Sequence, residues 1–211
     1  MKTLFTFLLL AGIISAQTIY KVTPGTNDNK IILTVENSST DLNMTDIRAF
    51  LSKKVPTINF KQTEQEIEKI EKQSSQDVEF TFDVNRVVDA NKIDTLKFKI
   101  TSNSGSWTKE IVIGYELPKD FVLEQNYPNP FNPSTTIEFS LPKEGKYSIR
   151  IYNILGQVVK TLADKTFEAG YHKITFDASR TEQGRSLTSG VYFYTLNGTE
   201  VNLVKKMMLM K

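Results

Sequence analysis

The feature that most constrains this fold is a two-residue alternation of apolar and polar side chains, which recurs in short segments along most of the chain. Between Val78 and Val84, every second residue is valine or phenylalanine, and the residues between them are polar. Successive side chains of a strand point to opposite faces, so this segment predicts a strand buried on one face. Ile19 to Tyr115 is therefore expected to form a compact all-β domain, with further strands at Lys30–Glu36, Ile47–Leu51, Leu96–Ile100 and Trp107–Ile113.

The alternation resumes after a boundary near Glu116–Phe121, where Pro118 lacks the backbone donor that a strand ladder needs. Asn197-Gly198 predicts a hairpin turn, because both residues tolerate positive φ. Two antiparallel sheets packed face to face are expected in this second half. Its expected strands are Ile137–Leu141, Tyr147–Ile151, His172–Phe176, Val191–Leu196 and Val201–Met210.

The segment Thr63–Lys72 permits two interpretations. It is rich in glutamate, glutamine and lysine, and Ile67 and Ile70 lie three residues apart. That spacing fits one or two helical turns on the surface, whereas an edge strand followed by a loop fits the composition equally well. Charge-rich segments of this kind usually mark a solvated face, so no function is assigned to it.

The N-terminus has the composition of a secretory signal peptide. Lys2 precedes an apolar run from Leu4 to Ile14, and the small residues Ser15-Ala16 come next. The run is short for a membrane span, so cleavage after Ala16 is favoured over a permanent anchor. The predicted organisation is a signal peptide at 1–16, an N-terminal domain at 17–116, a linker at 117–122 and a C-terminal domain at 123–211.

Composition narrows the chemistry available. The net charge is +2 with no long basic stripe, so no nucleic-acid partner is expected. The chain has no cysteine and a single histidine, His172, which lies within an alternating strand and is expected to be structural. Calcium at Asp177 and Glu182 satisfies no ligand spacing rule. No catalytic residue, metal site or cofactor is therefore predicted.

One irregular segment stands out, with the sequence NYPNPFNP. It holds three prolines in six residues, alternating with asparagine and flanked by aromatic side chains. Proline fixes φ and asparagine can bond to its own backbone, so this segment is expected to be a stiff strap outside any central strand. Tyr127 and Phe131 are expected to pin the strap to the sandwich.

Several ordered motifs carry a family resemblance. The run QNYPNPFNPSTTIEFSLP begins at Gln125, and Ile151–Gln157, Ala169–His172, Ser189–Tyr194 and the basic-apolar tail Lys205–Lys211 follow it. Together they resemble the type A C-terminal sorting domain of type IX secretion cargo, over about Phe121 to Lys211. The residues that the resemblance singles out as the sorting motif are Asn126, Tyr127, Pro128, Asn129, Pro130, Phe131, Asn132, Pro133, Gly156, Gly190, Val191, Tyr192, Lys205, Lys206 and Lys211.

The resemblance implies an export route and a fold. Members of this family cross the inner membrane by the general secretory machinery, and an outer-membrane type IX translocon and its sortase then recognise them. The cargo is released or attached to surface lipopolysaccharide. The fold is similar to the Ig-like domain of flagellar hook-capping proteins. The last strand, Val201–Met210, is expected either to be a plain core strand or also to offer its edge to a receptor.

The N-terminal domain is faintly similar to bacterial Ig-like adhesion modules. The expected fold class is therefore all-β, with two Ig-like antiparallel β-sandwich domains in tandem after a cleaved signal peptide. The function expected is that of a secreted or cell-surface protein, not an enzyme, whose N-terminal domain binds an unknown ligand or acts as a spacer. The alternatives are a small secreted hydrolase that uses surface carboxylates and a flagellar hook-cap-like scaffold, against which the signal peptide argues.

Overall fold

The structure is a computed structural model that describes residues 4–8, 18–86, 89, 91–179 and 186–211. The chain divides into two compact units, Met1–Glu116 and Leu117–Lys211. The described residues form strands, turns and loops without a helix, so the predicted all-β class with Ig-like β-sandwiches is confirmed. Within these residues, no helix is long and apolar enough to span a membrane.

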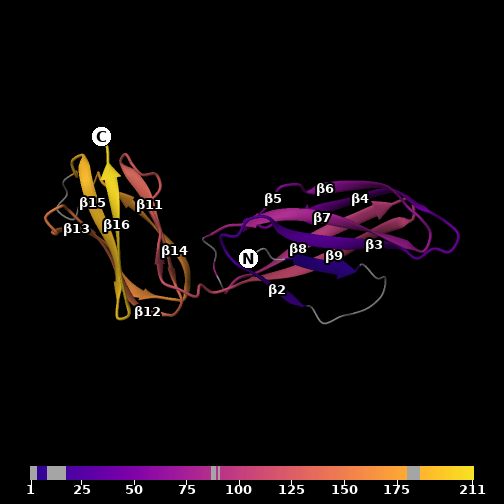
Figure 1. The fold of residues 1–211 in the computed structure, drawn as a ribbon, viewed down its shortest axis with the longest axis horizontal. Helices are drawn as coiled ribbons and strands as arrows, with labels where there is room; N and C mark the ends of the chain where they lie inside the picture. The colour runs from indigo at the N-terminus through magenta and orange to yellow at the C-terminus, as the bar shows by residue number, and fades with distance from the viewer. Residues whose placement is uncertain (1–3, 9–17, 87–88, 90, 180–185) are drawn as a thin grey trace. The chain divides into compact units, whose positions relative to one another are not determined.

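The N-terminal unit contains two sheets, visible as the indigo to magenta strands of Figure 1. One is four-stranded in the order β1-β3-β7-β5, and the other is five-stranded in the order β2-β9-β8-β4-β6. The strands are β1 (Leu4–Leu8), β2 (Ile19–Val22), β3 (Asn29–Asn37), β4 (Met44–Lys53), β5 (Ile58–Phe60), β6 (Glu64–Ile70), β7 (Ser74–Val84), β8 (Ile93–Ser102) and β9 (Gly105–Tyr115).

The core of this unit follows the alternation in the sequence. Phe80, Phe82 and Phe98 are fully buried, and the ring centroids of Phe80 and Phe98 lie 4.8 Å apart. Phe80 comes from β7 of one sheet and Phe98 from β8 of the other. The two sheets thus close over one another through large aromatic side chains, as face-to-face packing of a sandwich requires.

The charged segment at Thr63–Lys72 contains β6, an edge strand paired antiparallel with β4. The edge-strand interpretation is therefore correct. Ile67 and Ile70 are both buried because the pairing is interrupted opposite Asp46, whose φ is 53°. That interruption, and not a helix, explains the three-residue spacing.

The first strand, β1, lies inside the predicted signal peptide. It pairs in parallel with β3, from Leu4 opposite Lys30 to Leu8 opposite Thr34. The remainder of segment 1–16 lies outside the described residues. Removal of the segment stays a prediction.

The C-terminal unit also contains two sheets, drawn in orange to yellow in Figure 1. They have the orders β10-β11-β14 and β13-β12-β15-β16. The strands are β10 (Val122–Leu123), β11 (Ser134–Leu141), β12 (Gly145–Tyr152), β13 (Val158–Phe167), β14 (Gly170–Asp177), β15 (Gly190–Gly198) and β16 (Val201–Leu209). Their inward side chains form one apolar cluster that includes Ile137, Ile149, Phe176 and Tyr194.

The predicted hairpin turn is displaced by two residues. Asn197 pairs with Asn202 and Gly198 with Val201, so the turn is Thr199-Glu200 and the predicted turn residues end β15. Gly198 has a different role, because a Cβ at this position would lie 2.5 Å from Cδ1 of Tyr147. The glycine is needed for close packing and not for a positive φ.

Candidate functional site

The strap between β10 and β11 is held by a buried asparagine. The side chain of Asn126 donates from Nδ2 to the carbonyl of Pro128 at 3.0 Å and to Oγ1 of Thr135 at 2.9 Å. Thr135 in turn donates to the same carbonyl of Pro128 at 2.8 Å. Asn126 is only 2% exposed, so these bonds replace water and fix the bend of the strap.

A buried tyrosine joins the strap to the opposite sheet. The hydroxyl of Tyr194 accepts a hydrogen bond from the backbone N–H of Asn126 at 2.8 Å and donates one to the carbonyl of Glu124 at 2.7 Å. Burial raises the pKa of Tyr194 to about 12, so the phenol remains a donor at ordinary pH. The strap is thereby tied to β15, which carries Tyr194.

The strap also closes the outer edge of the last strand. The backbone N–H of Phe131 donates to the carbonyl of Met208 at 3.0 Å, and the N–H of Met210 donates to the carbonyl of Phe131 at 3.0 Å. Asn129 Oδ1 accepts from the N–H of Met208 at 2.9 Å, and Gln125 Nε2 donates to the carbonyl of Lys206 at 2.7 Å. Residues 206–210 of this edge are therefore occupied.

This closure limits the edge that the last strand could offer to a receptor, the second of the two roles expected for it. Along one edge of a strand, every second residue directs its N–H and carbonyl groups outward. On the outer edge of β16 these residues are even-numbered. Among the described residues, no strap contact reaches Asn202 or Val204. β10 also lies close to β16. The core-strand role is fulfilled by Met207 and Leu209, which are buried.

The two aromatic residues of the strap behave differently. Phe131 is 2% exposed, and its ring lies 5.8 Å from that of Phe176, so it pins the strap as predicted. Tyr127 is 82% exposed, and the prediction that its ring also pins the strap is wrong. Its backbone makes the attachment through a pair of hydrogen bonds with Thr136, at 3.0 and 2.9 Å. The exposed members of the strap are Pro128, Asn129, Pro130, Asn132 and Pro133.

Three of the other motif residues, Gly190, Val191 and Tyr192, line a hollow of about 620 Å³. Its lining comes from the turn that contains Gly156 and from the start of β15, including Gly190, Val191 and Tyr192. Gly156 has φ 76°, which suits the tight turn in which its N–H bonds to the carbonyl of Asn153. The apolar side chains at this turn are exposed, Ile154 by 73% and Leu155 by 76%.

The C-terminal residue lies at the same hollow. The backbone N–H of Lys211 donates to Oγ of Ser189 at 3.0 Å, and its side-chain ammonium bonds to Oγ of Ser186, both of which line the hollow. Lys205 and Lys206 lie farther back along β16, exposed and paired with Tyr194 and Phe193. The structure thus brings the tail, the Gly190–Tyr192 segment and the Gly156 turn to one end of the unit.

His172 has the structural position predicted for it. Its ring stacks on Phe139 with centroids 5.3 Å apart and meets the ring of Phe167 edge-on at 5.2 Å. Its Nε2 lies 2.9 Å from the carbonyl of Glu168. Within the described residues, no three histidine or carboxylate side chains group together as a metal site would require; Glu182 lies outside those residues.

Among the described residues of the N-terminal unit, one carboxylate is buried, that of Asp94, which is 7% exposed. Its Oδ2 accepts from the hydroxyls of Thr57 at 2.7 Å and Tyr115 at 2.6 Å, and its Oδ1 lies 3.1 Å from Nζ of Lys92. Burial raises the pKa of Asp94, but the hydrogen bonds from Tyr115, Thr57 and Lys92 outweigh burial and hold it below the usual value. Burial and the bond to Asp94 raise the pKa of Tyr115.

Comparison with known proteins identifies the C-terminal unit. Residues 125–210 match the family model of the secretion system C-terminal sorting domain. No curated protein matches the chain.

Solved structures give weaker likenesses. The Pseudomonas aeruginosa CupB2 chaperone is 9% identical with a TM-score of 0.33, over 92% of this chain and 99% of the other. PorZ, a surface component of the type IX secretion system of Porphyromonas gingivalis, is 16% identical with a TM-score of 0.32, over 59% of this chain but only 16% of its own. A Porphyromonas gingivalis W83 protein of unknown function is 10% identical with a TM-score of 0.32, over 90% and 92%.

These low TM-scores establish neither a shared function nor a shared arrangement of domains. The family match is specific, since it covers the strap, the Gly156 turn, Gly190–Tyr192 and the last strand in one continuous segment. The C-terminal unit of this chain therefore belongs to the type IX secretion C-terminal sorting domains, and the chain is a protein exported through the periplasm to the cell surface or the medium.

Proposed function

We propose that the chain is a non-catalytic secreted or surface protein whose C-terminal unit is recognised at the hollow by the outer-membrane translocon and its sortase. The observation that carries this proposal is the convergence of Lys211, Gly190–Tyr192 and the Gly156 turn on one end of the unit. Exposed Ile154 and Leu155 supply apolar surface there, as recognition sites on folded proteins commonly do.

For the N-terminal unit we propose a binding or spacer role. Its buried polar side chains bond within the fold and are not directed at an open site. Asn37 Nδ2 donates to the carbonyls of Leu42, Ile70 and Glu71 at 2.9 to 3.2 Å, and Asp94 is satisfied by Tyr115, Thr57 and Lys92. Such groups stabilise a fold and leave function to the exposed surface. A purified chain assayed against pooled polysaccharide and peptide substrates is expected to show no turnover; turnover would contradict the non-catalytic role.

The export test uses a variant that changes the hollow without changing the core. Ile154→Ser combined with Leu155→Ser is expected to leave folding intact, because both side chains are mostly exposed, and to shift the chain from the medium or cell surface to the periplasm. Leu117→Ser, at a 49% exposed position of the same unit, is the matched control and is expected to export normally. Normal export of the double variant would refute recognition at the hollow.

Cleavage and attachment are measured on the product itself. Mass spectrometry of the exported protein is expected to show loss of residues 1–16 and of the C-terminal unit, as sortase processing requires. A modified new C-terminus would indicate attachment to lipopolysaccharide, and an unmodified one would indicate release. An exported form that retains Lys211 would contradict C-terminal processing.

A further inference from the structure

The outer edge of β3 has one neighbour among the described residues, the leader strand β1. The hydrogen bonds of β7 show which backbone groups of β3 face this edge. The carbonyl of Thr81 accepts from the N–H of Lys61 at 2.9 Å, and the carbonyl of Glu79 accepts from Gln62, so odd-numbered residues of β7 face away from β3. Even-numbered residues of β7 face β3, and their antiparallel partners there are odd-numbered.

The even-numbered residues of β3 therefore direct their N–H and carbonyl groups toward β1. These residues are Lys30, Ile32, Thr34 and Glu36. Removal of residues 1–16 takes β1 away and leaves all four with an open edge. This step rests on the proposed removal of the signal peptide.

We propose that the mature chain forms a two-fold dimer in which β3 pairs antiparallel with β3 of a second copy, centred on Leu33. In this arrangement residue i lies opposite residue 66 − i, so Lys30 lies opposite Glu36 of the second copy and Ile32 opposite its Thr34. The contact is isologous, because each copy offers the same strand to the other. Without β1, each copy has a three-stranded sheet of β3, β7 and β5, and the two sheets join through β3 into one continuous sheet.

The register is selected by two independent requirements. Hydrogen bonding requires that even-numbered residues meet even-numbered residues, and only centring on Leu33 uses all four outward residues at once. A shift by two residues loses one of these pairs. The same centring places Lys30 opposite the oppositely charged Glu36 at both ends of the contact. Opposite-charge pairs across neighbouring strands stabilise their pairing. Either shift removes both charge pairs.

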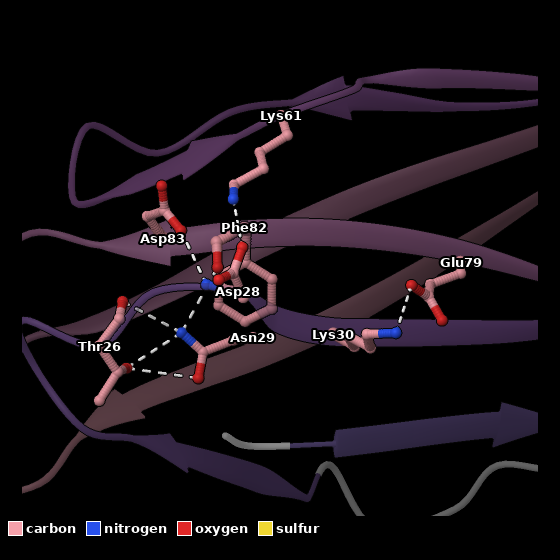
Figure 2. Close-up of polar contacts among 8 residues, drawn as sticks. All are labelled: Thr26, Asp28, Asn29, Lys30, Lys61, Glu79, Phe82 and Asp83. Carbon is pink, nitrogen blue, oxygen red and sulfur yellow. Dashed lines mark hydrogen bonds and ion pairs between the residues drawn. The ribbon is translucent and has the colours of Figure 1, made fainter. Parts of the chain in front are cut away.

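The strand is held ready for such pairing. Figure 2 shows Asn29 at its start, where the fully buried side chain donates from Nδ2 to the carbonyl of Thr26 at 3.2 Å, to its Oγ1 at 3.0 Å and to the carbonyl of Phe82 at 3.4 Å. Figure 2 also shows Lys30, whose Nζ lies 2.8 Å from Oε1 of Glu79 on β7. Order of this kind before contact lowers the entropy lost on association.

The other edges of the N-terminal unit are less suited to pairing. β2 has four residues and β5 has three, and β6 carries a row of charged side chains that includes Glu64, Glu66 and Glu68. Short or charged edge strands are a common protection against unwanted pairing. β3 has nine residues in uninterrupted register with β7 and contains no proline. Its two charged residues, Lys30 and Glu36, have opposite signs and lie opposite one another in the proposed register.

The test measures association of the chain produced with its leader and purified after export to the periplasm. Sedimentation equilibrium is expected to show a concentration-dependent dimer. Lys30→Glu and Glu36→Lys are each expected to raise the dimer dissociation constant by about tenfold, because two opposite-charge pairs become like-charge pairs. The double variant restores opposite charges and is expected to return to within about threefold of the parent chain.

Two further variants separate pairing from folding. Ile32→Pro removes an outward N–H without touching the β7 ladder and is expected to abolish the dimer while circular dichroism stays unchanged. Glu79→Gln removes the partner of Lys30 within the same copy and is expected to leave the dissociation constant within about threefold. A monomeric mature chain, or single charge variants that the double variant does not rescue, would overturn the proposal.

The mass of the purified chain shows whether residues 1–16 have been removed, independently of the association measurement. If residues 1–16 are retained, the proposed processing fails, and a chain that begins at Gln17 is measured in the same way. A dimer of that chain with the charge-swap pattern upholds the pairing of β3. A monomer overturns it whatever the fate of the leader.

Discussion

The two units of this chain treat an exposed strand edge in opposite ways. In the C-terminal unit, the outward groups of Lys206, Met208 and Met210 are bonded by Gln125 and by Asn129 and Phe131 of the strap. In the described part of the N-terminal unit, the outward edge of β3 is paired only with β1, which lies within a segment predicted to be cleaved. One edge is closed by a permanent part of the domain and the other by a part that is expected to leave.

This difference indicates that the strap protects the edge of β16. An open edge is a template for pairing with other chains, and closing it protects a strand that would otherwise associate. The proline and asparagine of the strap suit this role, because they end regular pairing while still supplying carbonyl and amide groups to β16. We therefore expect recognition by the export machinery at surfaces other than residues 206–210, such as the hollow.

The strongest way to break the comparison is to remove the anchor of the strap. Phe131→Ala deletes a buried ring in contact with Phe176 and is expected to lower the free energy of unfolding of the C-terminal unit by about 3–4 kcal/mol. Hydrogen exchange is expected to accelerate at the amides of Met208 and Met210, which bond to the strap. Tyr127→Ala, at an exposed ring, is the control and is expected to change stability by less than about 0.5 kcal/mol. Equal losses in the two variants would contradict the anchoring role of Phe131.

A smaller effect is expected where the strap meets β15. Tyr194→Phe leaves the N–H of Asn126 and the carbonyl of Glu124 without their buried partner, at a cost of about 2 kcal/mol in chemical denaturation. Tyr192→Phe is the matched control, because its hydroxyl bonds only to the carbonyl of Thr188, which is exposed to water. If Tyr192→Phe lowered the free energy of unfolding as much as Tyr194→Phe, the hydrogen bonds of Tyr194 to the strap would have no particular importance for stability.

The same tyrosine gives the strap a defined pH dependence. Burial raises the pKa of Tyr194 to about 12, above the value of about 10 in an unfolded chain. Its contribution to stability is therefore complete below about pH 10 and declines as the pH rises toward 12. Tyr194→Phe is expected to lack this alkaline decline.

The sequence predicted long strands whose two faces differ, and it missed β13, a long strand whose faces do not. Val78–Val84 alternates cleanly, and it lies in β7 with its apolar side chains buried. β13 was not predicted, because its side chains are half-buried or exposed on both faces up to Phe167, so no period of two is present. Alternation reports burial on one face, and a strand without that asymmetry gives no signal.

The candidate site was predictable in its parts and not in its assembly. The strap was located from proline and asparagine alone, whereas aromatic character did not distinguish buried Phe131 from exposed Tyr127. The bonds from the strap to β16 join residues almost eighty positions apart, through backbone groups that every residue possesses. No residue type marks such a contact, which explains why the sequence left open whether the last strand offers its edge to a receptor.

The smallest expected effect concerns Asp94 of the N-terminal unit, which accepts a hydrogen bond from the hydroxyl of Tyr115. Tyr194 of the C-terminal unit instead bonds to backbone groups. The pKa of Asp94 is held below its usual value, so its contribution to stability is present above about pH 4 and is lost as the pH falls through the folded-state pKa. Asp94→Asn is expected to lower stability by about 1 kcal/mol at pH 7, because the bonds from Tyr115, Thr57 and Lys92 lose their charge assistance. The difference from the parent chain is expected to shrink below pH 4 in denaturation measured across pH. Asp77→Asn, at an exposed position, is the control, and a difference in Asp94→Asn that persists unchanged at pH 3 would show that the carboxylate charge is not what stabilises this unit.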